Sequence, residues 1–377
     1  FDYNVIPNHF NYRMNILLIE PYYTGSHKQW AEGYKSHSLH NIKILHMKGQ
    51  FWKWRMHGGA VTLARKFNKM DWKPDLILAT DMLDLTTFLS LTRKKSNGIP
   101  IAIYFHENQL SYPWSPTDRD KQKNRDNHYG FINYSSALSA DKVFFNSVFH
   151  MDSFIGHLNT FLKQFPDHQE FDTIEEIREK SEVLYLGIDL ERFDGHIANR
   201  SSRPLILWNH RWEYDKNPEL FFRVLKKVKQ DGSDFGLVVL GENFSRSPNI
   251  FGEIKKELSD HIIQWGYVDS FKEYAEWLWK SDIMPVTSNQ EFFGASVMEA
   301  IYCNVWPILP NRLTYPELIP SKYHVNNIYR TEDELYQKIS LAIKNHSNMI
   351  QGQLCTIAGK FDWKVMAPKY DHELSTI

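Results

Sequence analysis

The chain has 377 residues, of which 42% are hydrophobic and 24% charged, and its formal net charge at pH 7 is −1. This length favours two domains of about 150–200 residues over a single core. Only two cysteines are present, which argues against a disulfide-stapled secreted protein and favours a cytoplasmic one. No apolar run approaches the ~20 residues that span a bilayer, so we expect no membrane partner. Residues 1–13 precede Met14 and are interpreted as a leader or cloning remnant.

Short β-branched runs alternate with longer amphipathic segments, a pattern typical of parallel α/β sheets. The pattern occurs twice, separated by a polar stretch that ends at Arg203 and lacks clear periodicity. We therefore predict two doubly wound, Rossmann-like parallel sheets that face a cleft: an N-terminal domain at 14–190, a linker at 191–203 and a second domain at 204–355. The predicted strands are 15–19, 42–46, 76–79, 101–105, 143–145 and 183–186 in the first sheet, and 205–208, 237–240, 262–265, 283–286 and 306–309 in the second. Predicted helices include 28–37, 126–140, 218–230 and 271–279.

One segment of the first half is strongly basic. No acidic residue lies between Glu32 and Asp71, although eight Lys and Arg residues do. A solvated basic surface is one interpretation, but aromatic residues among the cations favour RNA, because phosphates pair with cations and bases stack on rings. The candidate contacts are Lys48, Trp52, Lys53, Trp54, Arg55 and Arg65.

The first strand of the second half leads into a loop that carries Arg211 and Lys216 and ends at Asn217-Pro218, a good start for a helix. Arg can bind phosphate oxygens with its fork while Lys adds a point charge, which suits a diphosphate. The alternative is ordinary surface charge paired with nearby acids.

A second loop, Glu291 to Gly294, follows a later strand of the same half and precedes a helix that carries Glu299. Backbone N–H groups at such a helix start point toward an anion. Glu299 can accept hydrogen bonds from a ribose diol, and Glu291 can reach sugar hydroxyls. Taken alone, the two glutamates could instead be a helix-dipole acid and a solvated helix residue.

Two loops of the first half complete the candidate site. Gly25 and Ser26 follow the first strand and could let the backbone approach a phosphate or sugar, but the three-glycine dinucleotide fingerprint is absent. His106, Glu107, Asn108 and Gln109 follow the fourth strand, and polar clusters at strand ends are typical of sites. No zinc-type spacing of His and Cys occurs, so we expect no metal.

These elements together resemble the retaining GT-B family 4 glycosyltransferases and, more closely, the tRNA-queuosine mannosyltransferase family. The resemblance runs from Met14 to Trp363. It rests on Ile19-Glu20 with Gly25-Ser26-His27-Lys28-Gln29, Tyr104-Phe105-His106-Glu107-Asn108-Gln109-Leu110 with Tyr112-Pro113, Phe145-Asn146-Ser147-Val148-Phe149, His210-Arg211-Trp212-Glu213 with Asp215-Lys216, and Glu291-Phe292-Phe293-Gly294.

The resemblance implies a GT-B fold, GDP-mannose as donor and the cyclopentene diol of queuosine in a tRNA anticodon as acceptor, with no metal and no obligate protein partner. It also implies that 356–377 forms a last helix that packs back on the first domain. Retention would come from front-face attack, with a donor phosphate oxygen taking the acceptor proton. The implied catalytic residues are Arg211, Lys216, Glu291 and His106. The donor-binding set is Gly25, Ser26, Arg211, Lys216, Tyr267, Glu291, Phe293, Gly294, Ala295 and Glu299. The acceptor set is His27, Glu107, Asn108 and Gln109, together with the basic and aromatic residues named above.

Three alternatives remain open from the sequence: a family 4-type enzyme with another nucleotide sugar or a lipid or glycan acceptor, an enzyme that makes or isomerises a nucleotide sugar, and a non-catalytic tRNA-binding module.

Overall fold

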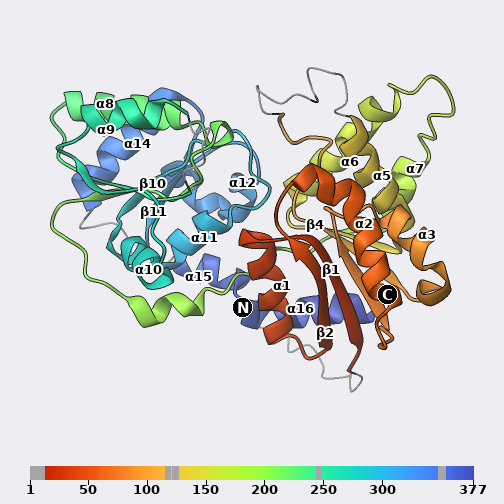
Figure 1. The fold of residues 1–377 in the computed structure, drawn as a ribbon. Coiled ribbons are helices and arrows are strands. Elements are labelled where there is room, and N and C mark those ends of the chain that lie inside the picture. The colour runs from red at the N-terminus through yellow and green to blue at the C-terminus, as the bar shows by residue number, and fades with distance from the viewer. Residues whose placement is uncertain (1–12, 115–119, 121–126, 243–247, 347–353) are drawn as a thin grey trace.

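The computed structural model of the chain describes residues 13–114, 120, 127–242, 248–346 and 354–377. The predicted leader lies outside this range except for Arg13. Two domains stand side by side, each built on a parallel sheet, as predicted, and each sheet has six strands (Figure 1). The first sheet contains β1 (Asn15–Tyr23), β2 (Asn41–Lys48), β3 (Leu76–Thr80), β4 (Ile101–Phe105), β5 (Lys142–Phe145) and β6 (Ser181–Val183). The second contains β7 (Leu205–Trp208), β8 (Gly236–Val239), β9 (Ile262–Trp265), β10 (Ile283–Pro285), β11 (Trp306–Pro310) and β12 (Ile328–Tyr329).

Helices cover both faces of the first sheet because alternate strand residues point to opposite sides. Ile16 and Leu18 of β1 pack toward α1 and α16, whereas Leu17 and Ile19 pack toward α2, α3 and α6. The helices around this sheet are α1 (Gly25–His37), α2 (Trp52–Asn68), α3 (Leu85–Ser96), α5 (Asn127–Ser139), α6 (Val148–Leu162), α7 (Thr173–Glu179) and α16 (Trp363–Ser375).

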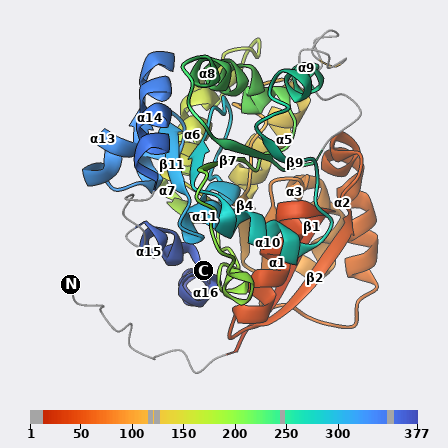
Figure 2. The same ribbon diagram turned by 90° about the vertical axis from the view of Figure 1, so that its left-hand side faces the viewer.

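The second sheet is covered in the same way. Leu205 and Leu207 of β7 pack toward α10 and α11, whereas Ile206 and Trp208 pack toward α8, α9 and α14. Figures 1 and 2 both show α8 and α9 on the opposite side of this domain from α10. Its helices are α8 (Pro218–Gln230), α9 (Ile250–Glu257), α10 (Phe271–Lys280), α11 (Ala295–Tyr302), α12 (Tyr315–Leu318), α13 (His324–Asn327), α14 (Glu332–Asn345) and α15 (Cys355–Ala358).

Three predicted elements differ from the structure by three or more residues at one end. The first strand continues to Tyr23, and α1 begins at Gly25 instead of Lys28. The predicted strand 183–186 is β6, which ends at Val183, because the next residues are covered by α16: Tyr370 Oη donates to Tyr185 O, and a side chain at Gly187 would collide with the Trp363 ring. The two-residue strand β12 was not predicted, since so short a run carries no recognisable alternation.

The last helix, α16, lies against α1 of the first domain (Figure 1). Trp30 Nε1 of α1 donates to Tyr370 Oη at 3.1 Å, and Tyr34 Oη donates to Asp371 at 2.8 Å. Within the described residues, none of the helices has the length and apolar character to cross a membrane.

Candidate functional site

The second sheet has its topological switch point between β7 and β10, where ligands of doubly wound sheets usually bind. The loops that follow these two strands meet there. Lys216 Nζ lies 3.0 Å from Gln290 O, 3.2 Å from the Asp215 carboxylate and 3.3 Å from Glu291 Oε2. The structure thus brings together Lys216 and Glu291, which are 75 residues apart in the chain.

The two cations of the β7 loop differ in exposure. Lys216 is buried, and although burial alone would lower its pKa, Glu291 and Asp215 outweigh that effect and raise it. The Arg211 side chain is 48% exposed and lies 3.3 Å from Glu213. Glu213 and then Tyr112 outweigh burial and raise the pKa of Arg211. Both groups therefore remain cationic and can neutralise a diphosphate.

Local features fix this loop. Asn217 adopts the left-handed conformation (φ 51°) and its side chain accepts a hydrogen bond from Leu220 N, so it caps α8 ahead of Pro218, as predicted. Gly241 follows β8 with a φ of 103°, and a Cβ there would lie 2.0 Å from His210 O. The two loops can approach each other this closely only because Gly241 has no side chain.

The start of α11 lies beside the same loop. Gly294 precedes the helix with a φ of 89°, Ala295 is its first residue, and Asn209 Nδ2 donates to Ser296 O at 2.9 Å. Glu299 is buried, and its two carboxylate oxygens accept from Arg192 Nη2 at 3.0 Å and Tyr274 Oη at 2.7 Å. A carboxylate has about four lone-pair positions, so Glu299 retains capacity for a ligand hydroxyl.

Two other residues of the predicted donor-binding set, Phe293 and Tyr267, differ in exposure. Phe293 is buried against Tyr185 and Phe361, so its side chain belongs to the core and only its backbone faces the loop. Tyr267 follows β9 and is 57% exposed.

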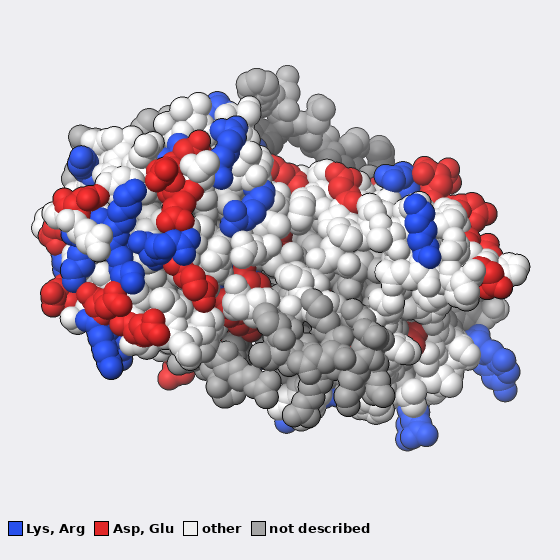
Figure 3. All heavy atoms as spheres, turned by 90° about the horizontal axis from the view of Figure 1, so that it is seen from above, with Lys and Arg blue, Asp and Glu red and all other residues white. Residues whose placement is uncertain are grey.

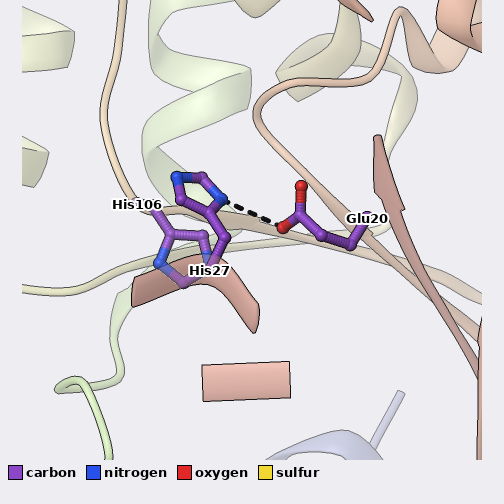
Figure 4. Close-up of side chains that lie close together, drawn as sticks. All are labelled: Glu20, His27 and His106. Atoms are coloured by element: carbon purple, nitrogen blue, oxygen red, sulfur yellow. Dashed lines mark hydrogen bonds and ion pairs between the residues drawn. The ribbon is translucent and has the colours of Figure 1, made fainter. Parts of the chain in front are cut away.

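In the first domain, His27 of α1 lies beside His106, which follows β4, and contacts Glu20, a buried acid of β1 (Figure 4). Its Nδ1–H donates to Glu20 Oε2 at 3.0 Å. Burial alone would lower the pKa of His27, but Glu20 outweighs it and raises this pKa to about 9. The His106 ring lies 4.4 Å from that of His27. Burial, followed by the charge on His27, lowers the pKa of His106 well below its usual value, so His106 is a neutral imidazole.

Two more carboxyl groups face His27. Asp81 accepts from His106 N at 2.8 Å, and burial raises its pKa well above the usual range. Burial likewise raises the pKa of Glu107, which lies near Arg211 of the other domain. A protonated histidine among acids of raised pKa is typical of functional sites.

Of the other residues in the 106–109 segment, Gln109 contacts a site residue, whereas Asn108 stabilises the local turn. Gln109 Nε2 donates to Glu107 at 3.0 Å and orients it. Asn108 is fully buried, and its Oδ1 accepts from Leu110 N and from Ser111 N, so it holds the turn together. Gly25 has a φ of 49°, and a Cβ there would meet no atom within 4 Å, while Ser26 is exposed beside it. That open backbone at the start of α1 fits the predicted approach of a ligand.

Among the described residues, Glu20, His27 and His106 form the one group with metal-ligand spacing, with ligand atoms within 4.8 Å of one another. A metal ion would have to displace the proton that His27 donates to Glu20. The expectation that no metal takes part stays a prediction.

Among the described residues, several direct contacts bridge the cleft, including a hydrogen bond that Tyr214 Oη donates to Pro113 O at 2.8 Å. Ser147 Oγ donates to Phe292 O at 2.6 Å, and the His150 ring stacks on that of Phe292 at 4.0 Å. The Glu317 carboxylate accepts from the first two N–H groups of α6 at 2.8 and 3.0 Å, so an acid of the second domain caps a helix of the first. Tyr112 Oη lies 3.4 Å from Asp215.

The candidate RNA contacts lie at the end of β2 and on α2, and they differ in exposure. Lys48, Trp54 and Arg65 are exposed. Trp52 turns inward and packs beside Tyr129, while Lys53 lies over that ring and forms an ion pair with Asp120 at 2.5 Å. Arg55 Nε donates to Lys48 O at 2.9 Å.

Sequence reasoning missed several residues of the site. Asp81 and Arg192 lie in a turn and in the predicted linker, where neighbouring residues gave no signal. Glu20, within β1, belongs to a motif of the family resemblance, but no role was predicted for it. His210 directly precedes Arg211, is buried, and lacks a partner for Nε2 among the described residues. Burial lowers its pKa to about 3, so it too is a neutral imidazole at the loop.

The comparisons with known proteins bear on both domains. A model of the tRNA-queuosine alpha-mannosyltransferase N-terminal domain matches residues 15–188, and one of glycosyl transferases group 1 matches residues 191–352. A Drosophila melanogaster protein named tRNA-queuosine alpha-mannosyltransferase is 34% identical over 335 residues, covering 86% of each chain. The chain belongs to the tRNA-queuosine alpha-mannosyltransferase family. The predicted family membership is therefore confirmed.

Solved structures similar to this family member are GT-B glycosyltransferases, which confirms the predicted fold class. Starch synthase IV from Arabidopsis thaliana has a TM-score of 0.71 at 14% identity, over 97% of this chain and 99% of that one. Sucrose-phosphate synthase from Thermosynechococcus elongatus has a TM-score of 0.69 at 13% identity, over 97% and 99%. At these identities the likeness shows the fold alone.

Proposed function

We propose that this chain transfers mannose from GDP-mannose to the cyclopentene diol of queuosine in tRNA. The name of the Drosophila relative, tRNA-queuosine alpha-mannosyltransferase, supports mannose transfer to queuosine. The observation that carries the donor-site assignment is the contact of Lys216 with Glu291, beside Arg211 at the switch point of the second sheet. A cytoplasmic location, expected from the low cysteine content, is part of this proposal.

On the donor side, the chain supplies fixed positive charge. Arg211 is exposed to the cleft and can hold phosphate oxygens through two parallel hydrogen bonds, while buried Lys216 adds a point charge. N–H groups at the start of α11 add partial positive charge. Negative charge grows on the diphosphate as its bond to the sugar breaks, and prearranged groups that stabilise such charge typically contribute about 10²–10³-fold each to kcat.

The proposed step balances without another reactant. The bond between sugar C1 and the β-phosphate oxygen breaks, a bond forms between C1 and a hydroxyl oxygen of the cyclopentene diol, and the hydroxyl proton passes to the departing phosphate. The products are an α-mannoside and GDP. Attack from the face of the leaving group retains configuration, so neither Glu291 nor Glu107 has to form a covalent bond to the sugar.

On the acceptor side, His106 and Glu107 are suited to hydroxyl groups. Neutral His106 has a buried Nε2 that is unpartnered among the described residues and can hydrogen-bond to a sugar hydroxyl. Glu107, with its raised pKa, faces Arg211 across the cleft and can accept from the diol. His27 then acts through His106 by fixing its charge state and orientation.

A two-way transfer assay tests the proposal. The protein is incubated with radiolabelled GDP-mannose, UDP-glucose or ADP-glucose and with tRNA that carries either queuosine or unmodified guanosine. Label should reach only the queuosine tRNA, and only from GDP-mannose. Transfer to both tRNAs, or to a lipid or glycan extract alone, would refute the acceptor. Preference for another sugar would refute the donor, and release of free sugar product would indicate a nucleotide-sugar enzyme.

A further inference from the structure

The exposed face of α2 carries a large aromatic side chain, Trp54, which packs against a glycine of the same helix. Trp54 is 63% exposed, a large fraction for an indole. Its ring lies against Gly58, one turn further along the helix, and a Cβ at Gly58 would lie 2.5 Å from Trp54 Cζ2. Glycine is unfavourable inside a helix, so its position under the ring has a local use. It makes the space in which the indole rests on the helix while the remaining surface faces solvent.

Trp54 differs in this respect from its neighbour Trp52. Trp52 packs with Tyr129 and Met56 in a small core cluster, and Lys53 is held over rings of that cluster. Burial explains both of those residues without a ligand. It does not explain Trp54.

Cations continue the face on which Trp54 lies. Residues 54, 58, 61, 65 and 69 are spaced by three or four and therefore share one side of the helix. Val61, Arg65 and Lys69 are exposed, and the Arg65 and Lys69 side chains form no ion pair within the described part of the chain. At a rise of 1.5 Å per residue, Arg65 is about 16 Å along the axis from Trp54.

The described residues provide no acidic partners for Arg65 and Lys69 on this face, whereas the cations of α8 in the second domain form ion pairs. Blue and red side chains alternate over the part of the second domain that carries α8 (Figure 3), where Arg223 pairs with Glu332 at 2.8 Å and Lys226 with Glu257 at 3.1 Å. On α2 no acid is available in the sequence from 33 to 70. An anionic partner is favoured at α2, whereas α8 already carries its counter-ions.

The N-terminal half of α2 packs against the end of β1 that follows Glu20, next to the cleft. A Cβ at Gly59 would lie 3.4 Å from Pro21, and Tyr22 packs against the cluster that contains Met56 and Trp52. Burial and then the charge of Glu107 raise the pKa of Tyr22, so the tyrosine that packs against this cluster also lies near a residue of the acceptor side. A macromolecule with one nucleoside in the cleft would reach this face.

We propose that Trp54, resting on Gly58, is a stacking platform for an unpaired base of the tRNA loop that carries queuosine, with Arg65 contacting the phosphate backbone further along α2. The inference rests on the proposed function for the identity of the RNA. An exposed ring followed by unmatched cations fits single-stranded RNA, because bases stack on aromatic rings and phosphates pair with Arg and Lys. An acidic protein would use the cations but would have no need for a fixed, open ring.

The test compares four variants by their dissociation constants for queuosine-containing tRNA. Trp54→Ala should weaken binding by about 5- to 150-fold, the range of one base stacked on an aromatic ring. Trp54→Phe should recover most of the loss. Gly58→Ala should weaken binding without lowering Tm, because alanine favours the helix but displaces the ring. Val61→Ala, a truncation on the same face, is the matched control and should bind within about twofold of the wild type.

Salt dependence separates the two contacts. Arg65→Ala should lower the slope of log Kd against log salt by about 1, whereas Trp54→Ala should leave the slope unchanged. The proposal is overturned if Trp54→Ala and Val61→Ala bind tRNA equally, or if Trp54→Phe is as weak as Trp54→Ala.

Its failure is distinguishable from failure of the proposed function. If the wild-type protein transfers mannose to tRNA but Trp54→Ala keeps full tRNA affinity, the proposed function stands and the stacking role of Trp54 is refuted. If the wild-type protein binds tRNA through Trp54 but transfers no mannose, the stacking role stands and the proposed function is refuted. In either case GDP binding, measured in parallel, should not change with Trp54.

Discussion

Removing the charge of Lys216 should abolish most of the activity. The ammonium lies between two carboxylates, 3.2 Å from Asp215 and 3.3 Å from Glu291. At an effective dielectric constant of about 20, opposite charges 3.3 Å apart attract by roughly 5 kcal/mol before desolvation is subtracted. Lys216→Met keeps the aliphatic stem but leaves both acids unneutralised where the donor diphosphate must bind. Losing one prearranged group of this kind typically lowers kcat by about 10²–10³-fold.

The same substitution should also destabilise the fold, because breaking a buried ion pair costs about 3–5 kcal/mol. A double variant, Lys216→Met with Glu291→Gln, separates the two effects. It removes one acid together with the cation, so it should recover much of the lost stability but none of the lost turnover.

The assay is steady-state transfer to queuosine tRNA, with Tm and GDP affinity recorded for the same preparations. The assignment of Lys216 to the leaving group would be refuted if the Lys216→Met variant is folded at the assay temperature and its kcat is within about threefold of the wild-type value.

Three further outcomes follow from the geometry. Because the folded-state pKa of His27 is raised to about 9, its contribution to stability should be complete below pH ~6.5 and lost as the pH rises through 9; denaturation of His27→Gln should show its deficit at pH 6 and little at pH 10, and a pH-independent deficit would contradict this. Glu317→Ala removes the acid that caps α6 across the cleft, so small-angle scattering should give a larger radius of gyration and kinetics a higher KM; an unchanged radius would count against the bridge. Glu299→Gln leaves Arg192 without its anion and removes a charge-assisted acceptor, so calorimetry should find GDP binding weakened by about tenfold or more; full affinity would remove Glu299 from the donor site.

Features that depend on neighbouring residues could be predicted from the sequence. Buried parallel strands read as short β-branched runs, so most strands were located to within two residues. Asn217-Pro218 carries its own capping chemistry, and the helix begins where it predicts. The proximity of Lys216 and Glu291 could be predicted because each follows a strand, and the strands of a parallel sheet place their carboxyl ends at one edge.

Features that depend on distant contacts could not be predicted. Composition cannot separate Trp52 from Trp54, because their different roles are set by Tyr129 and Gly58. Glu20 reads as the end of an apolar strand, and only the position of α1 shows that it holds a protonated histidine.

The central claim is that the donor site of the second domain serves a queuosine acceptor held by the first. The most direct measurement is the mass of the nucleosides recovered from queuosine tRNA after incubation with GDP-mannose and then complete digestion. The account predicts that queuosine gains one hexose with the wild-type protein and none with Lys216→Met. Unmodified queuosine after reaction with the active, folded wild type, or a hexose found on any other nucleoside, would contradict it.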